Sequence, residues 1–264
     1  MAGQDQAVLL RRGISRPLRA PGDLVVEPSA RFEEIKIRLP DPVHGLEEVS
    51  AVLGIPRWWP TGSRVSVLLA HDKTGDMNDP AVAHVHRQLT ERRYLTLRFN
   101  FPFAEARKSR PDSINVLRRT LRAALGALGR DPTAAPAHLF LGGKGLGGQV
   151  ALDVASSRLR VDGLFLMSYP LHPQGRPDKL QPDQLFRIVN PVLFLQGSRD
   201  RTCDLDVLRK TLTRVGAPSA LYIGQEADRN FAVPKKAPRT SDEVRDEISA
   251  ALDEWIQKVL GDNA

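Results

Sequence analysis

Leu141-Gly-Gly-Lys-Gly-Leu-Gly-Gly-Gln-Val150 is the most informative segment of the chain, because five glycines join an apolar run to an amphipathic one. Closely spaced glycines let a strand turn sharply into a helix, as in the G-x-S-x-G elbow that lifts a nucleophilic serine above a sheet. In that register the sequence reads Gly143-Lys-Gly-Leu-Gly147, and Gly145 stands at the serine position. The pattern predicts the turn without the hydroxyl.

Apolar and amphipathic segments alternate on both sides of this turn. Runs rich in Val, Leu, Ile and Phe predict strands over 64–70, 94–99, 137–141, 161–167, 191–196 and 220–224. Amphipathic stretches predict helices over 79–92, 112–129, 146–157, 204–215 and 241–260. The alternation predicts an α/β domain with a doubly wound, mostly parallel sheet flanked by helices. Segments 32–39 and 46–53 are expected to add one or two antiparallel strands.

The composition is typical of one globular domain. The chain has 264 residues, of which 41% are hydrophobic and 26% are charged. We expect the domain to span 31–264, after a loosely ordered N-terminal arm over 1–30; a transit peptide is the alternative for this arginine-rich start. The apolar runs are too short to cross a membrane. The single cysteine, Cys203, excludes an internal disulfide, which predicts a cytoplasmic protein.

The chain is basic, with 38 Lys and Arg residues against 31 acidic ones and a formal charge of +7. Such an excess can attract nucleic acid or an acidic partner. However, the basic residues are dispersed and alternate with acids, as in the segment 242–247. We therefore expect no specific nucleic-acid binding and no membrane binding.

Several motifs resemble a branch of the α/β-hydrolase superfamily that is related to dienelactone hydrolases and includes the testis-expressed and NSL-complex-subunit-like proteins. In that branch the elbow reads Gly-Gly-Lys-Ser-Met-Gly-Gly, which Gly142 to Gly148 match except at Gly145 and Leu146. The other matching motifs lie at Leu68–Asp72, Leu97–Pro102 and Tyr169–Pro173. The resemblance covers about residues 60–260 and implies an α/β-hydrolase fold. The connection 168–190 is too short for a lid domain.

The resemblance also indicates which positions of this chain correspond to the Ser-Asp-His triad of the branch. Asp200 matches the triad acid, whereas Arg229 stands where the branch has its histidine, so Gly145, Asp200 and Arg229 are the vestigial triad positions. Acyl transfer needs a nucleophile and a base, and a guanidinium cannot accept a proton. Asp72 further replaces a glycine of the oxyanion loop. The remaining residues expected to line the pocket are His71, Asp72, Lys144, Leu146 and His172.

Two hypotheses describe what occupies the vacated site. The favoured one is an ion pair between Asp200 and Arg229. The other is a bound anion or phosphorylated ligand at the bare helix N-terminus, close to Lys144 and Arg229.

Other site chemistries fit the sequence less well. Gly143-x-Gly145-x-x-Gly148 satisfies a dinucleotide fingerprint, but its acidic partner, Asp162, is expected to begin its strand rather than end it. Cys203 is a conceivable nucleophile, although a lone cysteine is more often a packing residue. Asp72 and Asp76 could hold a cation, but Lys73 lies between them in the sequence. We therefore expect neither a cofactor nor a metal.

The sequence thus predicts a degenerate α/β-hydrolase that acts as a non-catalytic binding or scaffold protein. Its expected partner is a small molecule or anion, or another protein. The alternative is a hydrolase of small esters or lactones with a noncanonical active site.

Overall fold

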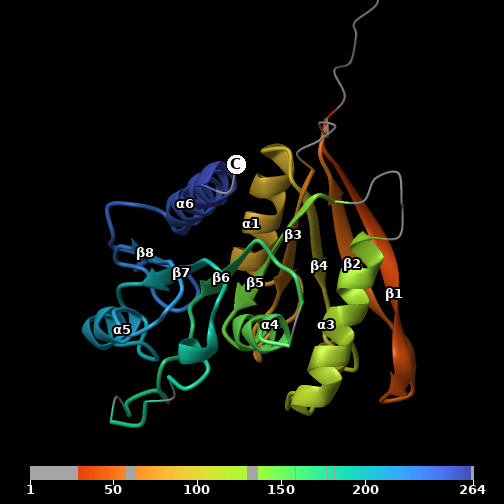
Figure 1. The fold of residues 1–264 in the computed structure, drawn as a ribbon, viewed down its shortest axis with the longest axis horizontal. Helices are drawn as coiled ribbons and strands as arrows, with labels where there is room; N and C mark the ends of the chain where they lie inside the picture. The colour runs from red at the N-terminus through yellow and green to blue at the C-terminus, as the bar shows by residue number, and fades with distance from the viewer. Residues whose placement is uncertain are drawn as a thin grey trace, which may run out of the picture.

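An eight-stranded sheet with the strand order β1-β2-β4-β3-β5-β6-β7-β8 forms the centre of the protein (Figure 1). The computed structural model describes residues 29–57, 64–129, 136–157, 159–176, 178–180 and 182–262. The strands are β1 (Arg31–Val43), β2 (Leu46–Ile55), β3 (Val65–Ala70), β4 (Leu95–Phe99), β5 (His138–Lys144), β6 (Gly163–Met167), β7 (Val192–Gly197) and β8 (Ser219–Gly224).

The strands from β4 through β3 to β8 pair in parallel, whereas β1 pairs with β2 and β2 pairs with β4 in antiparallel fashion. Every residue of β3 and of β7 is buried, as a parallel strand covered on both faces requires. The predicted doubly wound, mostly parallel sheet and its two antiparallel strands are therefore confirmed.

Helices cover both faces of the sheet. They are α1 (Pro80–Glu91), α2 (Pro102–Glu105), α3 (Ile114–Leu128), α4 (Leu146–Ala155), α5 (Leu205–Leu212) and α6 (Ser241–Asp262). Apolar residues of α1 and α6 share one core with the sheet, and those of α3, α4 and α5 share another. Figure 1 shows α3, α4 and α5 in front of the sheet and α1 behind it. The sheet is therefore the middle of three layers.

Several bounds differ from those of the predicted elements. Strand β5 continues to Lys144, because Gly142 and Gly143 still pair with β6 on one side and with β3 on the other. The four-residue helix α2 was not predicted, since it is too short to show a helical period. Between β6 and β7, the described residues form only a short 3₁₀ turn, η1 (Leu185–Arg187), which agrees with the absence of a lid domain.

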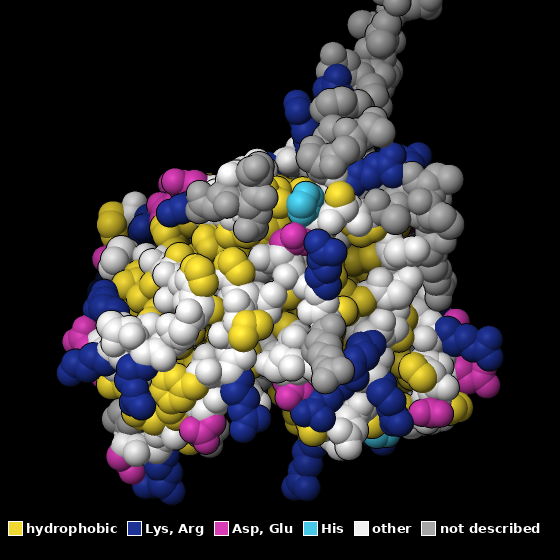
Figure 2. Space-filling model, viewed as in Figure 1, with side chains coloured by type: hydrophobic (Ala, Val, Ile, Leu, Met, Phe, Trp, Pro, Cys, Tyr) yellow, Lys and Arg dark blue, Asp and Glu magenta, His cyan; other side chains and the backbone are white. Residues whose placement is uncertain are grey.

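Residues 1–28 lie outside the described residues, so the N-terminal arm expected over 1–30 stays a prediction. The first strand, β1, begins at Arg31. In the described ranges, none of the helices combines the length and apolar character needed to cross a bilayer. Lys and Arg side chains are dispersed over the face in Figure 2, among acidic and apolar ones.

Candidate functional site

The predicted elbow lies between β5 and α4, at the carboxyl ends of the central strands. Gly145 has φ 51° and ψ −111°, and the helix starts at Leu146. A residue with a side chain adopts a positive φ only at an energetic cost, and turns with such backbone angles are common at reaction centres. Next to it, Gly147 packs against the end of β3, where an ideal Cβ would lie 2.7 Å from the carbonyl oxygen of His71. The glycines thus allow a sharp strand-to-helix turn without the cost that a side chain would add.

An ion pair between Asp72 and Arg229 lies directly over this turn. Arg229 reaches the Oδ2 atom of Asp72 with Nη2 at 2.5 Å and with Nε at 3.1 Å. The Oδ1 atom of Asp72 accepts a hydrogen bond from the backbone N–H of Leu146 at 2.9 Å. In a hydrolase elbow, the N–H at this position binds the oxyanion of the substrate. In this protein, that N–H is already bound by the carboxylate of Asp72.

The environment of Asp72 keeps its carboxylate charged. Burial alone would raise the pKa, but the Arg229 charge and the backbone N–H groups of Leu146 and Lys73 outweigh burial and hold the pKa of Asp72 below its ordinary value. The side chain of Asp72 is 2% exposed and that of Arg229 is 21% exposed. The pair is thus buried on its acidic side and open on its basic side.

The ion pair also fills the space that a residue-145 side chain would need. An ideal Cβ on Gly145 would overlap the Asp72 carboxylate and would lie 2.5 Å from Nη2 of Arg229. Real Cβ atoms do not come this close to other heavy atoms. A serine at position 145 is therefore incompatible with the Asp72–Arg229 pair as it stands.

The predicted ion pair between Asp200 and Arg229 is wrong, because Arg229 pairs with Asp72 instead. The Asp200 carboxylate accepts hydrogen bonds from Nε2 of Gln196 at 2.8 Å and from the backbone N–H and the hydroxyl of Thr202 at 2.8 and 2.7 Å. The same hydroxyl oxygen accepts a hydrogen bond from Nη1 of Arg229 at 3.0 Å. Thr202 thus bridges the two residues, which do lie in one site.

Lys144 does not reach the site, contrary to expectation. Its ammonium group is buried and donates to Asp79 at 2.5 Å and to Asn230 at 2.8 Å. Asp79 also caps the N-terminus of α1 through hydrogen bonds to the N–H groups of Ala81 and Val82. Lys144 therefore ties the end of β5 to α1, and the hypothesis of an anion held by Lys144 at the bare N-terminus of α4 fails. Asp72 already occupies that terminus.

In each of the two histidines expected in the pocket, both ring nitrogens form hydrogen bonds with backbone groups. Nε2 of His71 accepts the N–H of Phe101, and its Nδ1 donates to the carbonyl oxygen of Asp72. His71 is fully buried, and burial lowers its pKa. Nε2 of His172 accepts the N–H of Asp204, and its Nδ1 donates to the carbonyl oxygen of Pro173. Both rings position loops.

The other candidates are also accounted for. Cys203 is buried, and burial followed by the charges of Asp200 and Asp204 raises the pKa of its thiol to about 12. Such a thiol is a poor nucleophile at neutral pH. Asp162 precedes β6 and accepts a hydrogen bond from the N–H of Leu139, so it lies at the amino ends of the strands. A dinucleotide site needs its acidic residue at the carboxyl ends, so Asp162 cannot serve such a site.

Two pockets meet at Arg229. The first, which we call the elbow pocket, measures about 480 Å³. It is lined by Asp72, Lys73, Thr74, Pro111, Leu146, Gln149, Pro170, His172, Pro173, Gln174, Thr202 and Arg229. It therefore includes Asp72, Leu146 and His172 of the predicted lining, whereas His71 and Lys144 do not line it.

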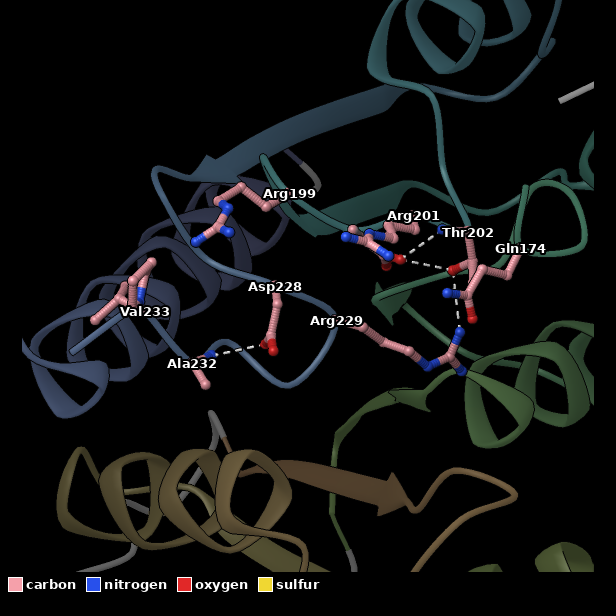
Figure 3. Close-up of a pocket in the computed structure, with 10 residues that line it drawn as sticks. Gln174, Arg199, Arg201, Thr202, Asp228, Arg229, Ala232 and Val233 are labelled. Atoms are coloured by element: carbon pink, nitrogen blue, oxygen red, sulfur yellow. Dashed lines mark hydrogen bonds between the residues drawn. The ribbon is translucent and has the colours of Figure 1, made fainter. Parts of the chain in front are cut away.

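The second pocket, which we call the arginine pocket, measures about 460 Å³. It is lined by Gln174, Arg199, Asp200, Arg201, Thr202, Asp228, Arg229, Ala232, Val233 and Pro234. Figure 3 shows that its side chains come from the loops that follow β7 and β8, with Gln174 added from the connection after β6. Gln174, Thr202 and Arg229 belong to both pockets.

Sequence reasoning missed Thr202, Gln196 and Asp79, which hold the charged residues in place. Two of them carried a usable signal. Thr202 follows Asp200 at the spacing of a local side-chain turn, and Asp79 precedes a proline at the expected N-cap of α1. The pairing of Asp72 with Arg229 carried none, because 157 positions separate the two residues.

Comparisons with known proteins agree with this architecture. Residues 63–257 match the model of the alpha/beta hydrolase domain family. A dienelactone hydrolase from Anabaena variabilis is 21% identical, with a TM-score of 0.62 over 84% of this chain and 96% of that one. An α/β serine hydrolase without a lid from Xanthomonas campestris is 20% identical, with a TM-score of 0.62 over 84% and 95%. The esterase domain of a Rhodothermus marinus protein is 18% identical, with a TM-score of 0.62 over 86% and 98%. At these identities the likeness shows the fold.

Proposed function

The chain belongs to the alpha/beta hydrolase domain family, and we propose that it is a non-catalytic member that acts as a binding or scaffold protein. The observation that carries this proposal is the Asp72–Arg229 ion pair. It lies on the N–H of Leu146 and fills the space above Gly145. The protein's own carboxylate thus occupies the position where a substrate oxygen would need to bind.

The chemistry of the site supports the same conclusion. Hydrolysis by a covalent acyl intermediate needs a nucleophile and a neighbouring base that removes its proton. Gly145 offers no nucleophile, and the guanidinium of Arg229 cannot act as a base. The thiol of Cys203 is buried and protonated at neutral pH, and both nitrogens of His172 are engaged by the backbone.

We also infer that the chain belongs to the dienelactone-hydrolase-related branch that includes the testis-expressed and NSL-complex-subunit-like proteins. The Gly-Gly-Lys run at 142–144 supports this assignment. Its lysine is buried in an ion pair with Asp79, a structural role that is independent of catalysis. Such a lysine can be retained after the reaction centre is lost.

The competing function is a hydrolase of small esters or lactones. One observation favours it, because the structural relatives include a dienelactone hydrolase and an esterase domain. The elbow pocket has the volume of a small-molecule site, about 480 Å³. This function needs a nucleophile other than residue 145.

Turnover of p-nitrophenyl acetate separates the two functions. We expect the purified protein to match an Asp200→Ala variant and the uncatalysed background, and a fluorophosphonate probe to leave the chain unlabelled. Turnover well above background that Asp200→Ala removes would refute the non-catalytic proposal. A Cys203→Ala variant would then show whether the thiol carries the reaction.

A further inference from the structure

The outer edge of β1 has no partner strand among the described residues. β1 is the terminal strand of the sheet and lies at one side of the molecule, with β2 as its neighbour (Figure 1). It has 13 residues, against six in β8 at the opposite edge. An edge strand presents unpaired N–H and C=O groups and can pair with a strand of another chain. β1 therefore offers a long surface for strand pairing.

Alternate residues of β1 direct their backbone groups to this free edge. The carbonyl oxygen of Ser50 in β2 accepts the N–H of Asn100, so the backbone groups of Ser50 face β4. Because neighbouring residues of a strand face opposite sides, Ala51 faces β1, where it lies opposite Ile35. Ile35 thus pairs with β2, and the residues that alternate with it face outward. They are Phe32, Glu34, Lys36 and Arg38.

One register of a symmetric strand pair matches opposite charges. When two copies of β1 pair antiparallel about a twofold axis at Ile35, Glu34 of each copy lies opposite Lys36 of the other. Their side chains are on the same face of the sheet, where an opposite-charge pair is stabilising. An axis at Glu34 or at Lys36 would instead place that residue opposite itself, and like charges in this position are destabilising. The charges therefore select the axis at Ile35.

The side chains at these positions are accessible to a second copy. Glu34 is exposed, and the side chain of Lys36 is 54% exposed. The ammonium group of Lys36 donates to Ser50 at 3.0 Å and lies 3.6 Å from Glu105, which leaves a third donor for a carboxylate of the second copy. Ile35 is half-buried against the core on the α3 face, so pairing would add an apolar contact at the axis.

Charges and prolines on an edge strand commonly prevent pairing with other chains. In β1 the prolines come after the charged segment, at Pro40 and Pro42, and they end the pairing because proline has no N–H. Before them, the signs of Glu34 and Lys36 make the strand complementary to itself when it is reversed. The segment 32–38 is thus suited to one partner, a second copy of the same strand.

We propose that the protein forms a symmetric dimer in which the segments 32–38 of two copies pair antiparallel, with the twofold axis at Ile35. Both outward backbone groups of Glu34 and of Lys36 are then hydrogen-bonded, and the two sheets become one. Such an interface is isologous, because the same surface is used by both copies. The described residues that line the elbow pocket and the arginine pocket include none from β1, so the dimer leaves both pockets open.

Sedimentation of the purified full chain from about 1 µM to about 1 mM tests the proposal, because weak interfaces have Kd values in this range. We expect the wild type to dimerise, and we expect Glu34→Lys and Lys36→Glu each to weaken the dimer about tenfold or more. The first variant makes both charges positive and the second makes both negative, so each repels itself and complements the other. An equimolar mixture of the two variants should therefore dimerise like the wild type.

The matched controls are Glu254→Lys and Lys258→Glu, which make the same charge changes at exposed positions of α6 and should leave dimerisation unchanged. Recovery in the mixture also shows that both single variants are folded, since an unfolded chain has no strand edge to pair.

Residue-resolved hydrogen exchange of the wild type gives a second readout that needs no variant. The N–H groups of Glu34 and Lys36 should be protected at high protein concentration and should exchange rapidly at low concentration. The N–H of Ile35 should be protected at both concentrations, because it faces β2.

Three results would overturn the proposal. A wild type that stays monomeric up to about 1 mM would exclude the second copy as the partner of this edge. A dimer that keeps its Kd in both single variants would place the interface elsewhere. A mixture that stays monomeric while the wild type dimerises would refute the register at Ile35.

Discussion

Arg229→Ala should destabilise the protein, because it leaves the carboxylate of Asp72 buried without its countercharge. Removing one member of a fully buried pair costs about 3–5 kcal/mol, whereas an exposed pair is worth less than about 1 kcal/mol. The Asp72 side chain is 2% exposed and the Arg229 side chain is 21% exposed. Two backbone N–H groups, those of Leu146 and Lys73, still stabilise the carboxylate. We therefore expect a loss of about 2–3 kcal/mol, below the fully buried limit.

Thermal unfolding at pH 7 measures this loss. For a domain of this size, each kcal/mol shifts Tm by about 2–4 °C, which predicts a decrease of about 4–12 °C. The matched control is Arg38→Ala, because Arg38 is exposed on β1 and its replacement should change stability by less than about 0.5 kcal/mol. The double variant Asp72→Ala/Arg229→Ala should lose less than the two single variants combined, as contacting residues do.

The loss should also depend on pH. The pKa of Asp72 is depressed in the folded protein, so its ion pair contributes stability above about pH 4 that is lost as the pH falls further. The gap between wild type and Arg229→Ala should therefore be full at pH 7 and shrink below about pH 4. An Arg229→Ala variant that melts with the wild type at pH 7, or a gap that is constant with pH, would refute the reasoning.

Three further predictions concern buried groups. Burial and the Arg98 charge lower the pKa of His86 to about 3. Between about pH 6.5 and pH 3, the free energy of unfolding should therefore fall by up to ~1.4 kcal/mol for each pH unit of acidification. Urea titrations should show a flatter pH dependence for His86→Gln. Cys203 should react with a thiol reagent only after unfolding, and rapid labelling of the native protein would contradict its burial. Lys144→Met strands the Asp79 carboxylate and should cost about 3 kcal/mol in the same titrations, whereas a neutral result would contradict the buried pair.

Most of the fold could be predicted from periodicity alone. Buried parallel strands give apolar runs, and the expected strands over 64–70 and 191–196 match β3 and β7 to within one residue at either end. The elbow was also predictable, because the glycines at 142–148 specify close approach and a positive φ. The end of β5 was not predictable, because Gly142 and Gly143 lie in the strand although consecutive glycines are typical of a turn.

The contacts within the site could be predicted only in part. Placing Gly145, Asp200 and Arg229 after β5, β7 and β8 needed only the strand order and the resemblance. The choice of partner for Arg229 depends on distances of a few ångströms between loops far apart in the sequence. Thr202 donates a hydrogen bond to the nearby carboxylate of Asp200. Arg229 instead forms its ion pair with the buried carboxylate of Asp72.

We propose that the Asp72–Arg229 pair, and not a substrate, occupies the place that a hydrolase uses as its reaction centre. The most direct test of this proposal is p-nitrophenyl acetate turnover by the variant Gly145→Ser/Arg229→His/Asp72→Gly, compared with Gly145→Ser/Arg229→His and with the wild type. Because Asp72 overlaps the Cβ position of residue 145 and covers the N–H of Leu146, turnover should appear only in the triple variant. Equal turnover in the double variant, or turnover by the wild type, would contradict the claim.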